Sequence, residues 1–127
     1  MPISLGESLI VAAGGALGCI SRFLLQHVPW LQTDRWHHTL AVNLIGCLLI
    51  GFAATLFDAI GSSKTIRLLC ITGFLGGFTT YSTFTLDIVS LVRQGEPTQA
   101  LIYVGVTLAG GICAFMAGMW SASLIKS

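Results

Sequence analysis

The sequence predicts an all-α integral membrane protein, with residues 1–127 forming a single transmembrane domain. Hydrophobic residues make up 54% of the chain and charged residues only 9%, whereas a soluble domain carries about 25% charged residues. So few charges would not cover a surface that faces water on all sides. Four apolar stretches follow one another along the chain, and each reaches the ~20 residues that a helix needs to cross a bilayer.

The four predicted spans cover approximately residues 8–28, 39–60, 66–92 and 100–125. Backbone groups inside lipid must satisfy their own hydrogen bonds, and therefore each span is predicted to be a helix. Short connections join the spans and leave no room for a soluble domain. No Lys or Arg precedes the first span, which argues against a cleavable signal peptide.

The first span carries two glycines four residues apart, Gly14 and Gly18, and an arginine, Arg22, on the same face. Such glycine spacing favours close contact between helices in a membrane. Arg22 lies about one turn from the end of the span. It either extends toward the lipid headgroups or lines a wet vestibule that concentrates anions.

The second span contains one asparagine, Asn43, within AVNLIGCLLIG. An asparagine in lipid needs hydrogen-bond partners. One interpretation is a structural hydrogen bond between helices. The other is a site for an anion, because the side-chain amide has two N–H donors. The residue alone favours neither interpretation.

The third span combines glycines with hydroxyl side chains. Gly73, Gly76 and Gly77 precede Thr79 and Thr80. Each glycine costs about 1 kcal/mol relative to alanine in a helix interior, so this helix is predicted to break near the bilayer midplane. Such a break is tolerated where protein buries it or a cavity wets it, and it would expose carbonyl oxygens that suit Na⁺. The alternative is a kink that serves packing alone.

Two aromatic residues, Tyr81 and Phe84, follow the predicted break and share one helix face, because they are three residues apart. Aromatic pairs usually serve packing, but ring edges carry partial positive charge that can face a small anion. Ser82 and Thr83 add hydroxyl donors, and a new helix would begin with free N–H groups. This stretch is therefore interpreted as a dry, donor-rich path for an anion.

The remaining polar and sulfur-containing residues have less specific interpretations. Asp58 and Asp87 lie near span ends and are expected at the membrane interface, as are Trp30, Trp36 and Trp120. The four cysteines fall one in each span and never as CxxC. They are expected to be small packing residues rather than a metal or redox site.

Positive charges are nearly balanced between the two sides of the membrane that the spans define. The two sets are Lys64, Arg67 and Lys126 against Arg22, Arg35 and Arg93. The positive-inside rule then gives almost no preferred orientation. Either another feature fixes the orientation, such as Asp34 and Glu96 or an assembly partner, or the chain inserts both ways and pairs antiparallel. Four short helices seldom enclose a water path, which favours a two-fold dimer.

Three motifs carry a resemblance to the Fluc family of fluoride channels, also called CrcB: GGALGCISR, VNLIGCLLIG and GFLGGFTTYSTF. The resemblance covers the whole length of the chain. It implies an antiparallel, dual-topology homodimer with two pores and a central structural Na⁺, which exports toxic fluoride passively across the plasma (inner) membrane of a bacterium. The implied partners are fluoride, a second copy of the chain and the lipid bilayer, without nucleic acid.

The resemblance also implies roles for individual residues. The residues that would form the fluoride pore are Asn43, Tyr81, Ser82, Thr83 and Phe84. Arg22 would be the vestibule arginine. The backbone carbonyls of Gly76 and Thr79 would bind Na⁺, each contributed twice across the dimer axis.

The chain departs from the family pattern in two of its spans, the third and the fourth. Tyr81 stands where phenylalanine is usual, and its hydroxyl adds a donor and an acceptor. In the fourth span, Gly110–Gly111 replaces the usual Gly-Ser pair and Phe115 follows, so only Tyr103 and Thr107 remain of a ladder of hydroxyls.

A proton-coupled exporter of small ions or of drugs is the main alternative. A multidrug exporter of this size needs an acidic residue deep in the first helix, and the only acid near it is Glu7, before the span. The spans contain no paired carboxylates, Ser/His set or metal cluster, so the chain is predicted not to be an enzyme.

Overall fold

The computed structural model describes residues 2–31 and 35–126, except for the side chains of Arg35 and Lys126. Asp34, one of the acids considered for orientation, lies outside these residues. No strand occurs within the described ranges. The helices are α1 (Leu5–Leu25), η1 (Pro29–Leu31), α2 (Arg35–Ile60), α3 (Lys64–Arg67), η2 (Leu68–Leu75), α4 (Gly76–Phe78), α5 (Tyr81–Arg93) and α6 (Pro97–Lys126).

Within the described part of the chain, three helices are long and apolar enough to cross a membrane. They are Leu5–Leu25, Trp36–Ile60 and Pro97–Ile125, in α1, α2 and α6. The predicted all-α membrane class is therefore confirmed. The predicted spans 39–60 and 100–125 lie within α2 and α6, whereas α1 begins and ends earlier than the predicted span 8–28.

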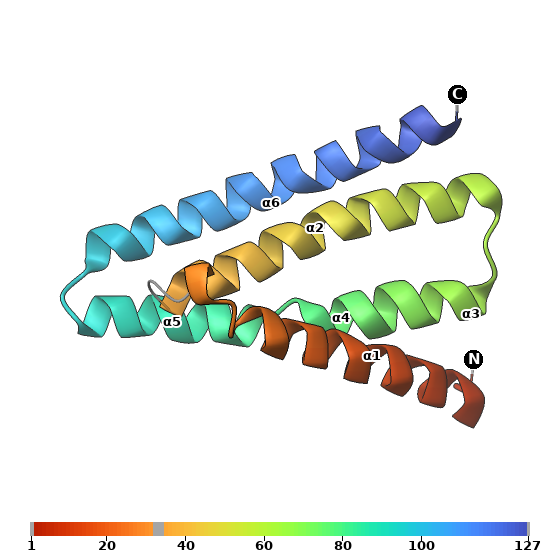
Figure 1. Ribbon diagram of the computed structural model, residues 1–127, viewed down its shortest axis with the longest axis horizontal. Coiled ribbons are helices and arrows are strands. Elements are labelled where there is room, and N and C mark those ends of the chain that lie inside the picture. The colour runs from red at the N-terminus through yellow and green to blue at the C-terminus, as the bar shows by residue number, and fades with distance from the viewer. Residues whose placement is uncertain (1, 32–34, 127) are drawn as a thin grey trace.

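The third predicted span, 66–92, is a series of shorter helices. The helices α3, η2, α4 and α5 follow one another end to end as one rod (Figure 1). η2 is a π-helical segment, a wider form that is rare and occurs mostly as single turns within α-helices. Two extended residues separate α4 from α5.

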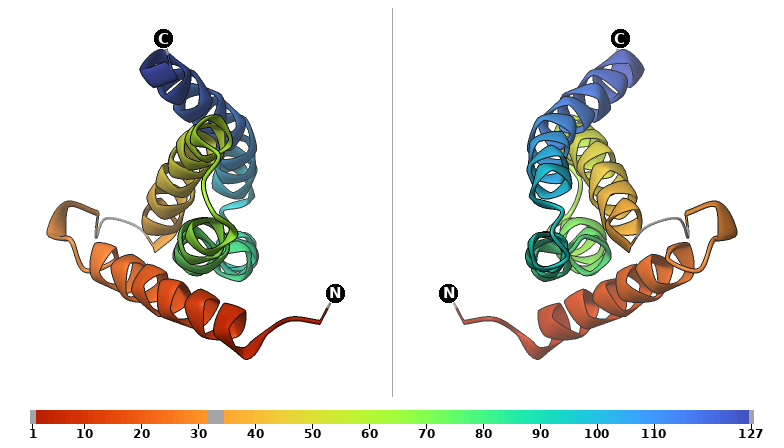
Figure 2. Two further views of the ribbon diagram at one scale, coloured as in Figure 1. Left: turned by 90° about the vertical axis from the view of Figure 1, so that its right-hand side faces the viewer. Right: turned by 90° about the vertical axis from the view of Figure 1, so that its left-hand side faces the viewer.

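The rod of α3 to α5 lies between α1 on one side and the pair of α2 and α6 on the other (Figure 2). α2 packs along α6, and α1 packs against η2 and α4. Figure 2 shows α1 crossing beneath the rod, on the side away from α6. Both termini and the connection between α2 and α3 lie at one end of the molecule, and the connection between α5 and α6 lies at the other (Figure 1).

Glycines allow α1 to approach the rod closely. A Cβ on Gly14 would overlap the carbonyl oxygen of Leu69, and a Cβ on Gly18 would overlap that of Phe74. The prediction that these two glycines mediate a tight helix contact is confirmed. The contact places the backbone of α1 directly against η2 and α4, the part of the rod that precedes the two extended residues.

The pairing of α2 with α6 uses the same device. A Cβ on Gly51 would overlap the carbonyl oxygen of Phe115, and a Cβ on Gly118 would overlap that of Leu48. Close backbone approach of this kind maximises van der Waals contact, which drives helix association in lipid, where the hydrophobic effect does not.

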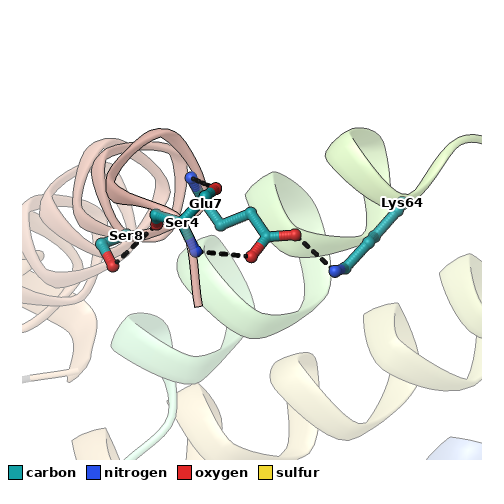
Figure 3. Close-up of polar contacts among 4 residues, drawn as sticks. All are labelled: Ser4, Glu7, Ser8 and Lys64. Carbon is teal, nitrogen blue, oxygen red and sulfur yellow. Dashed lines mark hydrogen bonds and ion pairs between the residues drawn. The ribbon is translucent and has the colours of Figure 1, made fainter. Parts of the chain in front are cut away.

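Polar contacts fix the start of α1 at the end of the molecule that carries both termini. Ser4 is the N-cap, and its Oγ accepts from the Glu7 amide (3.1 Å) while the Ser4 amide donates to the Glu7 carboxylate (3.2 Å). Glu7 also forms an ion pair with Lys64, the first residue of α3 (Figure 3). At the same end, exposed Asp58 pairs with Arg67 (2.6 Å). The Glu7–Lys64 pair joins the first turn of α1 to the first turn of the rod, and the Asp58–Arg67 pair joins the end of α2 to it.

The glycine contact of α1 makes a testable prediction. Gly18→Ala is expected to destabilise the protein by about 1–3 kcal/mol, because backbone atoms of Phe74 already occupy the position that the added methyl group needs. Gly105→Ala is the matched control, since its Cβ position has no neighbour within 4 Å apart from the adjacent residues and the backbone of its own helix. It is expected to be neutral or stabilising by up to ~1 kcal/mol. Thermal unfolding of the purified protein in detergent measures both, and equal midpoints would contradict the proposed contact.

Candidate functional site

The helical rod is interrupted at Thr79 and Thr80. α4 ends at Phe78, and the two threonines are extended, with φ and ψ of −81° and 158° at Thr79 and −149° and 119° at Thr80. Figure 1 shows this segment near the middle of the rod. Thr80 then caps α5, because its Oγ1 accepts from the amide of Thr83 (3.2 Å). A threonine in this position is a preferred helix N-cap.

Asn43 of α2 holds both backbone groups of Thr80. Its Nδ2 donates to the Thr80 carbonyl (3.0 Å), and its Oδ1 accepts from the Thr80 amide (2.9 Å). A backbone amide only donates and a carbonyl only accepts, so this pair of bonds fixes which way the side-chain amide faces. One of the two N–H groups of Asn43 is used in this contact.

The interruption removes the helical donors of two carbonyl groups. In a continuous α-helix, Gly76 would accept from the amide of Thr80, and Thr79 would accept from the amide of Thr83. These amides donate to Asn43 Oδ1 and to Thr80 Oγ1 instead. Gly76 and Thr79 are the two residues whose carbonyls the family resemblance assigns to Na⁺.

A groove of about 660 Å³ lies beside the interruption. Residues from α2, η2, α4, α5 and α6 form its walls, which are mostly apolar. Of the predicted site residues, the structure brings five to this groove: Asn43, Gly76, Thr79, Tyr81 and Phe84. The described residues that line the groove do not include Ser82, Thr83 or Arg22.

The two predicted aromatic rings have very different surroundings. Tyr81 is 80% exposed and Phe84 is 8% exposed, although their ring centroids lie 6.0 Å apart. Phe84 also meets Tyr103 of α6 in an edge-to-face contact, with centroids 5.0 Å apart. Phe84 therefore belongs to the core of the chain, whereas Tyr81 stands on its surface at the edge of the groove.

The hydroxyl groups that follow the interruption form a small cluster. Thr80 Oγ1 donates to Thr83 Oγ1 (3.0 Å) and lies 3.5 Å from Ser82 Oγ. Ser82 is exposed, and Thr83 is partly buried. The cluster sits at the first turn of α5, where helix N–H groups face outward and favour negative charge.

Arg22 belongs to α1, none of whose residues lines the groove. Its Nη2 is 3.8 Å from Cys19 Sγ, and that thiol lies 3.5 Å from the carbonyl oxygen of Gly77. The guanidinium is thus connected to the backbone of α4 through Cys19. These are weak contacts, because sulfur is a poor hydrogen-bond donor and acceptor.

A buried polar cluster lies next to Phe84, one of the residues that line the groove. The exposed fractions are 2% for Asp87, 2% for Thr39 and 0% for Tyr103. Asp87 Oδ2 accepts from the Thr39 hydroxyl (2.7 Å), and the Tyr103 hydroxyl lies 3.4 Å from the same oxygen. The carboxylate of Asp87 is thus enclosed by α2, α5 and α6. Its predicted position at the membrane interface stays a prediction.

The spacing of residues in the sequence contains a signal for this cluster. Asp87 follows Phe84 by three residues and Thr80 by seven, so all three share one face of α5. Thr39 precedes Asn43 by four residues on α2. Matching the two faces in antiparallel order pairs Thr80 with Asn43 and Asp87 with Thr39, as the structure shows.

These features define the chain as a helical multispan membrane protein whose polar groups gather where a helix is interrupted beside a groove, an arrangement typical of channels and transporters. The family model described as "CrcB-like protein, Camphor Resistance (CrcB)" matches residues 9–119. The chain belongs to this family.

Individual relatives agree with the family assignment. A protein of Chlorobium phaeobacteroides (strain BS1) named "Fluoride-specific ion channel FluC" is 43% identical, and the match covers 98% of each chain. Proteins with the same name from Rhizobium etli and Azotobacter vinelandii are 39% and 40% identical, over 89% and 91% of this chain and 93% and 95% of theirs. The relatives are channels, so the prediction that this chain is not an enzyme is confirmed.

The cap at Thr80 makes a testable prediction. Thr80→Val keeps the shape of the side chain but removes Oγ1, and with it the hydrogen bonds to Thr83. A loss of about 0.5–2 kcal/mol in stability is expected, while Thr80→Ser is expected to retain most of it. Thr85→Val is the matched control, because its hydroxyl only donates to the Tyr81 carbonyl on an exposed face. Unfolding midpoints in detergent that do not separate Thr80→Val from Thr85→Val would count against the cap.

Proposed function

We propose that the chain forms a fluoride-selective channel that allows toxic fluoride to leave a bacterial cell passively across the plasma membrane. The observation that carries the proposal is the 43% identity, over 98% of both chains, to a protein named as a fluoride-specific ion channel. The geometry at the groove supports it, because hydrogen-bond donors and aromatic rings gather there among apolar walls.

Fluoride selectivity follows from the small size and strong hydration of the ion. A dry pathway must replace the lost water with fixed donors, as the carbonyls of a potassium filter do for a cation. Asn43 has a second N–H group beyond the one that binds Thr80, and Phe84 offers a ring edge beside it in the groove. The proposed fluoride path consists of these groups together with Tyr81 and the hydroxyls of Ser82 and Thr83 in the first turn of α5.

The proposed assembly is an antiparallel homodimer in which the chain crosses the membrane four times and the interruption lies near the bilayer midplane. Each dimer then contains two pores. The open, mostly apolar groove beside exposed Tyr81 supports this arrangement, because a second copy would cover both. The balance of positive charge on the two sides supports insertion in both orientations, and Arg22 is the proposed vestibule residue.

A structural Na⁺ fits the same geometry. Unwound backbone carbonyls at helix interruptions are typical Na⁺ ligands in membrane proteins, and the carbonyls of Gly76 and Thr79 have lost their helical donors. One chain supplies two such oxygens, so two antiparallel copies would supply four. When bound, the ion contributes positive charge between the two proposed pores.

One observation favours a second candidate, a proton-coupled transporter of small ions. Asp87 is buried in the helical part of the chain, and buried acids in membrane helices often belong to proton relays. In that case, fluoride movement would depend on a proton gradient.

Fluoride efflux from liposomes that contain the purified protein tests the proposed pore. Asn43→Asp is expected to reduce the efflux rate by about 10- to 100-fold, because a carboxylate replaces the donor that meets the ion. Gln26→Glu makes the same chemical change at the C-cap of α1, outside the groove, and is expected to leave the rate unchanged. A fluoride electrode follows the release, and wild-type efflux by Asn43→Asp or by Phe84→Ile would refute the assigned roles.

The same liposomes separate the two candidate functions. A channel passes fluoride when potassium and valinomycin set the membrane potential, with equal pH on both sides and a protonophore present. Efflux that stops under these conditions and returns with a proton gradient would instead support the coupled transporter.

The proposed dimer and its Na⁺ are tested together in detergent. Replacing Na⁺ with N-methylglucamine is expected to lower the thermal midpoint of the purified protein, because the carbonyls of two copies lose their shared ligand. Light scattering is expected to give twice the mass of one chain in Na⁺. A single-chain mass would contradict the dimer, and an unchanged midpoint would contradict the structural Na⁺.

A further inference from the structure

Gly46 of α2 forms a notch in the wall of the groove, beside the interruption of the rod. The residue is buried, and both Gly46 and Thr79 line the groove. The methyl group of Thr79 lies in the notch, because a Cβ on Gly46 would overlap the Cγ2 atom of Thr79. The same Cβ would lie 3.6 Å from Cδ1 of Phe78, so this ring borders the notch. The missing side chain at position 46 therefore makes room for Thr79.

The hydroxyl group of Thr79 is fixed as well. Its Oγ1 donates to the carbonyl oxygen of Leu75 (3.0 Å), which also accepts from the Thr79 amide (3.1 Å). A threonine side chain turns about a single torsion, χ1, which carries both the methyl and the hydroxyl group. Without a shift of the backbone, the methyl group can therefore leave the notch only if the hydroxyl group leaves Leu75. The two contacts together hold Thr79 in one rotamer.

The peptide unit between Thr79 and Thr80 is held at its other end by Asn43. The Thr80 amide donates to Asn43 Oδ1 (2.9 Å). This peptide bond is trans and planar, so its N–H and C=O groups point in opposite directions. The Thr79 carbonyl therefore points away from the Asn43 side-chain oxygen. Its direction depends on both contacts, because one fixes the side chain of Thr79 and the other fixes the peptide that follows it.

Both contacts come from one face of α2, because Asn43 and Gly46 are three residues apart. A single turn of α2 thus lies along the two extended residues of the rod. A side chain at position 46 would either turn Thr79 out of its rotamer or move α2 away from the interruption. The second shift would lengthen the hydrogen bonds between Asn43 and Thr80. Either shift would change the direction of the Thr79 carbonyl.

We propose that Gly46 is a positioning residue for the structural Na⁺ site. By leaving room for the methyl group of Thr79, it fixes the direction of the Thr79 carbonyl, which is one of the proposed ligands. Close packing around the notch means that even one added methyl group displaces its neighbours. The proposal rests on the proposed function, because Na⁺ binding by the carbonyls of Gly76 and Thr79 is part of that function.

A titration with Na⁺ tests this role in the purified full-length protein. The thermal midpoint is measured in detergent while Na⁺ replaces N-methylglucamine stepwise at constant ionic strength. The Na⁺ concentration at which the midpoint begins to rise reports the affinity. Gly46→Ala is expected to raise this onset concentration roughly tenfold, because the added methyl group displaces Thr79. A residue with a purely structural role would lower the midpoint at every Na⁺ concentration and leave the onset in place.

Gly51→Ala is the matched control for Gly46→Ala. It adds the same methyl group to the same helix, but against the carbonyl oxygen of Phe115 in α6. The expected result is a lower midpoint both with and without Na⁺, with the onset concentration of the wild type.

A compensating change at Thr79 tests the contact itself. Thr79→Ser removes the methyl group that the alanine would displace, while it keeps the hydroxyl group for Leu75 and the backbone carbonyl. The double variant Gly46→Ala, Thr79→Ser is therefore expected to show an onset within about threefold of the wild type. This arm also serves if Gly46→Ala alone does not fold. A double variant that neither folds better nor responds to less Na⁺ than Gly46→Ala overturns the role of Gly46.

The remaining outcomes separate this role from the proposed function. If the midpoint of the wild type does not respond to Na⁺, the Na⁺ site fails, and the role of Gly46 fails with it. If the wild type responds and Gly46→Ala has the same onset, only the role of Gly46 is overturned. Neither comparison uses fluoride, so failure of the channel function is observed separately, as wild-type liposomes that release no fluoride.

Discussion

The paired hydrogen bonds between Asn43 and the backbone of Thr80 are the contact on which the rest of the site depends. A helix that stops inside an apolar environment leaves amide and carbonyl groups without partners, and water is scarce there to replace them. Asn43 satisfies both groups of Thr80 with one side chain. Because it does, the chain can remain extended over two residues, α5 can begin at Tyr81, and the carbonyls of Gly76 and Thr79 stay without helical donors.

Glycine contacts hold the elements that bring Asn43 and Thr80 together. α1 supports η2 and α4 through Gly14 and Gly18, while α2 is fixed to α6 through Gly51 and Gly118. The interrupted rod therefore lies between two closely packed neighbours. An interruption in an otherwise unsupported helix would be free to bend, whereas here its backbone positions are set from both sides.

The sequence predicted the parts of the structure that depend on local composition. The apolar stretches of α1, α2 and α6 mark membrane helices by their length and composition, and the glycine and threonine pattern of Gly73 to Thr80 identified the segment in which the two extended residues lie. The roles assigned to Asn43, Tyr81, Ser82, Thr83 and Phe84 in conduction, and to Gly76 and Thr79 in Na⁺ binding, remain predictions.

Other parts of the site could not be predicted, because they depend on how helices distant in sequence face each other. The enclosure of Asp87 depends on its partners, and one of them, Thr39, lies 48 residues away. The environment of Trp36 is set by Tyr103 from α6 in the same way. The π-helical form of η2 is a further case, since its apolar residues fit an ordinary helix equally well.

The contrast between Tyr81 and Phe84 has an evolutionary consequence. Phe84 contributes to the internal packing of the subunit, so any replacement there alters folding as well as the groove. Tyr81 contributes little to that packing, and a new side chain can be accepted there without cost to the fold of a single chain. During evolution, Tyr81 can therefore change without loss of a folded single chain, whereas changes at Phe84 must preserve the packing of the core.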